Sequence, residues 1–149
     1  MNESATEIAV EVPGWPPTKN EATSLLAARH SHAERVRVLL ESVQRAIQHD
    51  NWTVVTDEVA LDLVVRGPGR PPSDATNYLG GIGDVLQVKV GRNLDLTHLG
   101  ELGAVALYAD DRQIRTIHYS EEWATQPSYK VRIRRTAPVS AETASGAGT

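Results

Sequence analysis

The sequence predicts an α+β domain in which two helices pack on a small mixed β-sheet. Its 149 residues are 40% hydrophobic and 23% charged, which is the size and composition of one globular domain. Several short segments alternate apolar and polar residues as half-buried strands do, and two longer segments repeat apolar residues with a helical period. We therefore expect one domain over residues 7–135, a flexible start at 1–6, and a disordered tail at 136–149 that lacks large apolar side chains.

The alternation of apolar and polar residues predicts five strands. The first, EIAVEV, is followed by the loop PGWPPTKN, in which three prolines exclude a helix. The second, EVALDLVVR, is the most apolar, and we expect it near the centre of the sheet. The five segments are 7–12, 58–66, 104–108, 113–120 and 129–135.

Two helices are expected, over residues 32–48 and 75–86. In the first, one face carries Val36, Leu39, Leu40, Val43 and Ile47. The second contains Gly80, Gly81 and Gly83, each of which costs about 1 kcal/mol relative to alanine in a helix. Close packing against a neighbouring element would explain these glycines, and room for a ligand is the alternative. Residues 88–103 show no clear period, so we expect an inserted loop or hairpin there.

Charge and composition limit the possible partners. With 19 acidic and 15 basic residues the formal net charge is -4, which excludes a uniformly basic nucleic-acid binder but allows a local basic surface. The absence of cysteine excludes disulfides, a thiol nucleophile and cysteine-ligated zinc. No apolar run is long enough to span a membrane, and the first residues do not resemble a signal peptide, so we expect a cytoplasmic protein.

Two acidic positions are candidates for chemistry. Asp74 precedes the second helix, and Asp110 and Asp111 form a pair at a turn between two predicted strands. Carboxylates at the ends of separate elements can converge in a fold, where their repulsion favours Mg²⁺, or Mn²⁺, as a partner. Such an ion activates water for attack on a phosphodiester. The structural alternative is that these aspartates only cap a helix and form a turn.

Three segments, read in order, resemble one protein family. They are GWPPTKN (14–20), DATNYLGGIGDVL (74–86) and YADDRQIRTIHY (108–119). Together they resemble the RusA-like crossover junction endodeoxyribonucleases, which resolve Holliday junctions. The resemblance spans roughly residues 7–135, with 88–103 as an insertion.

The resemblance implies an active site of three aspartates on magnesium with a nearby lysine. Asp74 matches the first aspartate and Asp111 the last. The middle aspartate falls on Thr76 and the lysine on Gly80, so this chain departs from the family pattern at two positions. Asp62 or Asp110 could replace the missing acid, and Lys19 or Lys89 the missing cation. Asp84 is interpreted as structural.

The leading hypothesis is a metal-dependent endonuclease that hydrolyses phosphodiesters in branched DNA, such as Holliday junctions, during recombination and repair. Asp74 and Asp111 would hold Mg²⁺ or Mn²⁺, and Asp110 would act as an auxiliary catalytic acid. The alternative is a catalytically inactive relative that serves as a DNA-binding or protein-interaction module. By resemblance the protein is expected to be a homodimer. The residues expected to contact DNA, in part as a basic track around the metal pocket, are Lys19, Asn20, Asn77, Arg132 and Arg134.

Overall fold

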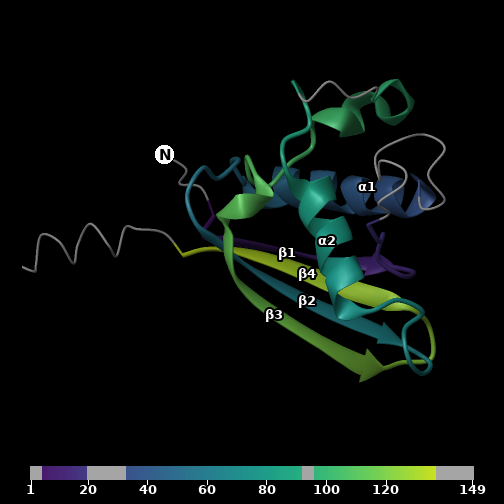
Figure 1. The fold of residues 1–149 in the computed structure, drawn as a ribbon. Helices are drawn as coiled ribbons and strands as arrows, with labels where there is room; N and C mark the ends of the chain where they lie inside the picture. The colour runs from purple at the N-terminus through teal and green to yellow at the C-terminus, as the bar shows by residue number, and fades with distance from the viewer. Residues whose placement is uncertain (1–4, 20–32, 92–95, 137–149) are drawn as a thin grey trace, which may run out of the picture.

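The computed structural model describes residues 5–19, 33–91 and 96–136 of the chain. These residues form the predicted α+β architecture, a four-stranded mixed sheet with helices on one of its faces (Figure 1). The strands are β1 (Glu7–Pro13), β2 (Val59–Gly67), β3 (Ile114–Trp123) and β4 (Ser128–Arg135). Their order in the sheet is β1-β4-β2-β3. β4 runs antiparallel to both of its neighbours, whereas β2 and β3 are parallel.

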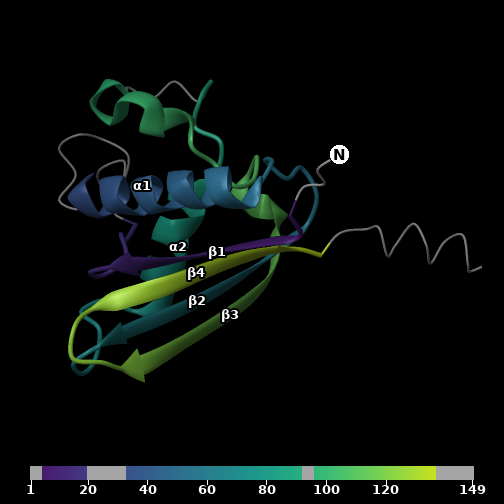
Figure 2. The ribbon, with the colours of Figure 1, turned by 180° about the vertical axis from the view of Figure 1, so that it is seen from behind.

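Alternation along the strands separates a buried face from an open one. In β1 and β4 every second side chain is buried against the helices, and the intervening residues lie on the other face. Figure 2 views the molecule from the side on which the strands lie in front of α2 (Ala75–Leu86). Each fully buried Val, Leu or Ile side chain stabilises the fold by about 1.5 to 3 kcal/mol. The buried hydrophobic side chains of β1, β2 and β4 are Ile8, Val10, Val12, Val59, Ala60, Leu61, Leu63, Val65, Tyr129, Val131 and Ile133.

The helix α1 (Ala33–Asp50) uses the apolar face predicted from its period. Val36, Leu39, Leu40 and Val43 are buried in the core. The helix is followed by Asn51, whose φ of 58° is the left-handed conformation that often ends helices. The two predicted helices are therefore confirmed, with α1 extending two residues beyond its expected end.

The predicted strand at 104–108 is absent. The chain instead forms a 3₁₀ segment over Thr97–Ala104 and then passes between two other segments, with single bridges from Tyr108 to Val55 and to Gln87. The residues from Val105 to Tyr108 are all buried, because this stretch is covered on both sides and has no solvent face. In the region expected to be a loop or hairpin, residues 92–95 lie outside the described part of the chain.

The glycines of α2 are explained in part by close packing. At Gly81 a Cβ would overlap the Pro17 carbonyl group, because the proline-rich segment after β1 crosses the helix at this point. A Cβ at Gly80 would meet only the Lys19 side chain, at 3.4 Å. Gly81 thus permits the contact between the helix and the segment that carries Lys19.

We expect Gly81→Ala to lower the free energy of unfolding by about 1 to 3 kcal/mol, because the new methyl group must displace backbone atoms. Gly80→Ala is the matched control. It adds the same methyl group where ordinary contact is possible, and should stabilise the helix by up to about 1 kcal/mol. Urea unfolding of both variants measures the difference. Equal effects of the two substitutions would contradict the packing account of Gly81.

Candidate functional site

The segment after β1 positions Lys19 against α2. Gly14, with a φ of 90°, redirects the chain and donates its N–H to Pro127. The ring of Trp15 then occupies the space over Gly67 that a side chain would need. Further along, the backbone N–H of Lys19 donates to the carbonyl of Asn77, 3.3 Å away. The stiff proline-rich segment is therefore held at both ends, and it fixes the path of Lys19 along the helix.

Lys19 lies beside Gly80 and reaches the acidic side chain of Asp84. Its Nζ is 3.5 Å from Asp84 Oδ2, and its aliphatic stem contacts the position that a Gly80 side chain would occupy. The Lys19 side chain is 53% exposed and that of Asp84 is 24% exposed. The ammonium group thus stands over the last turns of α2 while remaining accessible to a ligand.

Asp111 lies beside Gly83, at the same end of α2. It begins the 3₁₀ turn Asp111–Gln113, and its backbone N–H donates to Gln87 Oε1 at 2.9 Å. The Asp111 side chain lies 3.7 Å from the place of a Cβ on Gly83, so the missing side chain leaves it room. We refer to Lys19, Asp84 and Asp111 as the Lys19–Asp84–Asp111 cluster.

Electrostatics connect the members of this cluster. Partial burial raises the pKa of Asp111, and the negative charges of Asp84 and Asp110 raise it further, while Lys19 opposes the shift. Two carboxylates that repel each other on a partly buried surface are stabilised by a bound cation. The cluster thus has the charge and the oxygen ligands that a divalent metal ion prefers.

The raised pKa predicts a pH-dependent stability difference. The folded state holds the Asp111 proton more tightly than the unfolded state does, so ionisation of this group opposes folding. The cost is absent below the ordinary Asp pKa of 3.8 and is fully present above the raised pKa. Asp111→Asn should therefore be more stable than the parent at pH 7, and this electrostatic difference should shrink as the pH falls through the raised pKa and be absent below 3.8.

Unfolding in chelator-containing buffer, at pH 7 and at a pH below 3.8, measures this effect. Asp57→Asn, which removes an exposed carboxylate outside the cluster, controls for the loss of one negative charge. A stability gain in Asp111→Asn that does not change with pH would contradict the electrostatic explanation.

Asp110 has a structural position next to the cluster. Its carboxylate accepts hydrogen bonds from the backbone and the side chain of Arg112, and together with Gln113 it forms a capping box. The Gln113 amide in turn donates to the carbonyls of Val55 and Asp57. These contacts fix the turn that presents Asp111.

Asp74 lies at the opposite end of α2. It is the N-cap residue, and its Oδ1 accepts hydrogen bonds from the Asn77 backbone at 2.9 Å and from the Thr76 hydroxyl at 3.1 Å. The nine residue steps from Asp74 to Gly83 correspond to about 13 Å of helix. Asp74 therefore lies away from Asp111 along α2, whereas Asp84 lies at the same end of the helix as Asp111. Thr76 and Asn77 are exposed near Asp74.

Lys19 and Lys89, the two candidates for the missing cation, lie in different places. The Lys89 side chain is buried, and its Nζ donates to the carbonyls of Val85, Gln87 and Val105 at 2.6, 3.0 and 2.5 Å. These hydrogen bonds hold its ammonium at the carbonyl end of α2. Lys19 is the one of the two that lies beside Asp84.

The expected basic track does not surround the cluster. Arg132 and Arg134 alternate along β4 with Val131 and Ile133, whose side chains are buried under the helices. The two arginines consequently lie on the open face of the sheet, whereas the cluster is on the helical side. Asn20 lies outside the described residues.

Sequence reasoning did not place Asp84 beside Lys19, with which it forms an ion pair. Gly80 and Asp84 are four residues apart, so they share one helical face, and this spacing was the available signal. Within residues 5–19, 33–91 and 96–136 there is no group of three or more His, Asp or Glu side chains arranged to hold a metal ion. The cluster offers two carboxylates.

Comparison with known proteins leaves the chain without a family assignment: no protein-family model matches the sequence, and no curated protein matches it. None of the described helices combines the length and the apolar character needed to cross a membrane.

Proposed function

We propose that this protein is a RusA-like, metal-dependent endodeoxyribonuclease that acts on branched DNA. The observation that carries the proposal is the Lys19–Asp84–Asp111 cluster. Lys19 occupies the space beside Gly80, the position at which the resemblance expects a lysine, and it faces the acidic pair. A cation and two carboxylates thus converge although the sequence departs from the family pattern.

The donor set of the cluster fits magnesium. Mg²⁺ is commonly held by one or two carboxylates, with waters and substrate phosphate oxygens as its other ligands. Asp84 and Asp111 would hold the ion, which when bound supplies an activated water and neutralises charge on the phosphodiester. The Lys19 ammonium, half exposed above the pair, would bind a non-bridging phosphate oxygen and stabilise the charge that develops on it.

Cleavage of a synthetic four-way DNA junction tests the proposal directly. The purified chain should cut the junction in the presence of Mg²⁺ or Mn²⁺ and should stop when EDTA is added. A linear duplex of the same sequence serves as the substrate control. Absence of junction cleavage with either ion would refute the nuclease proposal.

The role of Lys19 leads to a prediction of rescue. Lys19→Ala should slow cleavage by about a hundredfold, since it removes the cation that stabilises the transition state. In that variant, Gly80→Lys should restore part of the rate, because truncating Lys19 empties the space that the new side chain enters. Single-turnover cleavage rates of the parent, the single variants and the double variant measure this. Gly80→Met in the Lys19→Ala background is the uncharged control and should give no rescue.

A second candidate is a module that binds branched DNA without cutting it. Its support is that the Asp74 carboxylate is engaged in capping and that Thr76 supplies only a neutral hydroxyl. Gel-shift binding to a junction without cleavage, together with absence of Mn²⁺ binding by calorimetry, would favour this module over the enzyme.

The proposed substrate also suggests an assembly and a location. A four-way junction needs two symmetric cuts, so we propose a homodimer with two-fold symmetry, acting in the cytoplasm. Sedimentation equilibrium gives the mass of the assembly, and a monomer at assay concentrations would contradict the dimer.

A further inference from the structure

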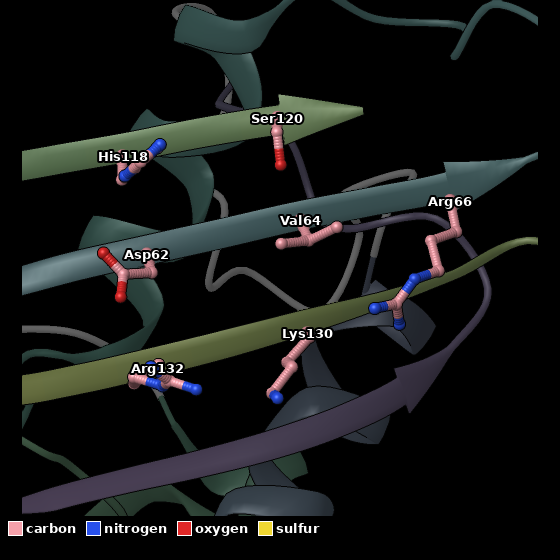
Figure 3. Close-up of a pocket in the computed structure, with 7 residues that line it drawn as sticks. All are labelled: Asp62, Val64, Arg66, His118, Ser120, Lys130 and Arg132. Carbon is pink, nitrogen blue, oxygen red and sulfur yellow. The ribbon is translucent and has the colours of Figure 1, made fainter. Parts of the chain in front are cut away.

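The open face of the sheet contains a pocket that the proposed nuclease chemistry does not use. Its volume is about 300 Å³, and side chains from three neighbouring strands line it (Figure 3). β4 contributes Lys130 and Arg132, β2 contributes Asp62 and Val64, and β3 contributes His118 and Ser120, with Arg66 at one end. The pocket lies across the sheet from the Lys19–Asp84–Asp111 cluster.

The strand register places these residues in two adjacent rows. Asp62 is paired with Arg132 on one side and with His118 on the other. In the next row, Val64 lies between Lys130 and Ser120. Neighbouring strands are about 4.8 Å apart, so the polar ends of these side chains can reach one ligand. The apolar Val64 side chain forms part of the pocket floor, with nitrogen and hydroxyl groups on either side.

Three acidic groups next to the pocket are paired with other cations. Asp62 forms an ion pair with Arg134, with an Nε to Oδ2 distance of 3.4 Å. Glu11, the cross-strand neighbour of Lys130, pairs instead with Arg66. Glu122 also binds Arg66, at 2.9 Å. The negative charges next to the pocket are thus compensated by Arg134 and Arg66.

Lys130 and Arg132 differ from these arginines. Among the described residues, neither makes an ion pair, and the buried Nε of Arg132 has no hydrogen-bond partner. An N–H group that is removed from water without an acceptor costs about 1 to 3 kcal/mol, so an anion that accepts this hydrogen bond would relieve the cost. The pocket therefore has positive charge and unused donors in the same place.

We propose that this pocket binds the phosphate group of a phosphate ester. Arg132 would donate through its planar guanidinium group, Lys130 would supply a second positive charge, and Ser120 and His118 would donate from the opposite wall. Donors from three strands suit a tetrahedral anion with several acceptor oxygens. The volume exceeds that of a phosphate ion, so the organic part of the ester also lies on this face. The ester is either a small molecule such as a nucleotide or the backbone of a nucleic acid.

The test measures binding to the full chain by calorimetry and by NMR amide shifts, in chelator-containing buffer. The probes are inorganic phosphate, adenosine 5′-monophosphate and a short DNA duplex. Binding should shift the amides of Ser120 and His118. Arg132→Gln should weaken binding about tenfold or more, the usual effect of losing a charge-assisted hydrogen bond.

Arg45→Gln is the matched control, because it removes the same charge from an exposed residue of α1, on the side of the sheet away from the pocket. It should change the affinity by less than about threefold at 0.15 M salt, where exposed charges are screened. If Arg132→Gln does not fold, Lys130→Gln and Ser120→Ala replace it, with the same expected direction.

The probes also separate the two sources of the phosphate. Tighter binding of the nucleotide than of the duplex indicates a small-molecule ester, and tighter, strongly salt-dependent binding of the duplex indicates a nucleic-acid backbone. Either result supports the phosphate pocket. Failure of all three probes to bind, or equal losses in Arg132→Gln and Arg45→Gln, would overturn it. Because metal is chelated throughout, this outcome is independent of junction cleavage.

Discussion

Asparagine in place of Asp111 should slow the proposed metal-dependent cleavage of a four-way junction by about a hundredfold or more, since in our proposal Asp111 holds the metal ion and a metal ligand contributes several kcal/mol to transition-state stabilisation. The substitution keeps the size of the side chain and the backbone contact to Gln87, so the turn should remain in place. Asp84→Asn should have a similar effect, because the two carboxylates would bind the same ion. Single-turnover cleavage with Mg²⁺ measures both variants.

Asp74→Asn separates the site seen in the structure from the site implied by family resemblance. Asparagine is as good an N-cap as aspartate, so the start of α2 is preserved while the negative charge is lost. If the metal lies at the Lys19–Asp84–Asp111 cluster, this variant keeps most of its activity. Loss of activity in Asp74→Asn with retention in Asp84→Asn would contradict the cluster as the active site and favour the arrangement expected from resemblance.

Replacing Lys89 with methionine should lower the free energy of unfolding by about 3 to 5 kcal/mol, as expected when one partner of a buried charged interaction is removed. The Lys89 ammonium donates hydrogen bonds to two carbonyls at the end of α2 and to that of Val105, directly after the 3₁₀ segment Thr97–Ala104. Methionine fills a similar volume but donates no hydrogen bond, so these carbonyls would be buried without that donor. The positive charge next to the helix C-terminus would also be lost.

Chemical denaturation of Lys89→Met measures the loss, and Lys130→Met is the matched control. Lys130 lies on the open face of the sheet without an ion pair among the described residues, so its replacement should change stability by less than about 0.5 kcal/mol. A loss in Lys89→Met no larger than in the control would show that the three hydrogen bonds contribute little. Because the carbonyl end of α2 also lies near Asp84, a loosened helix end should reduce cleavage as well.

The elements that could be predicted from the sequence are those whose pattern is local. The helical period of α1 and the strict alternation in β1 and β4 each depend on one face of one element being covered. The strand predicted at 104–108 was wrong, because the burial of this segment depends on Val55 and Gln87, which are distant in the sequence. In β3 the alternation correctly indicated a strand but not its exposure: Ile117, on the helical side, is 53% exposed.

The candidate site was predictable only in part, for a related reason. Asp111 and Lys19 were identified from their motifs, but their meeting at Asp84 depends on the path of the proline-rich segment across Gly81 and on the turn capped by Asp110. No single element encodes that arrangement. The side of the sheet on which Arg132 lies could have been predicted from the sequence. Its neighbours in β4 are apolar and must face the helices, which places the arginine on the other side.

The strand order has a consequence for the biogenesis of the protein. Among the described strands β1 pairs only with β4, and Glu7 lies opposite Arg134. β1 leaves the ribosome before the other strands, but it cannot pair until β4 has been synthesised and inserts between β1 and β2. Until then both strands expose unpaired backbone groups, and closure over such a sequence separation is slow. We therefore infer that the nascent chain depends on its C-terminal strand for protection against aggregation, so that a ribosome stalled shortly before β4 holds a chain that cannot complete its sheet.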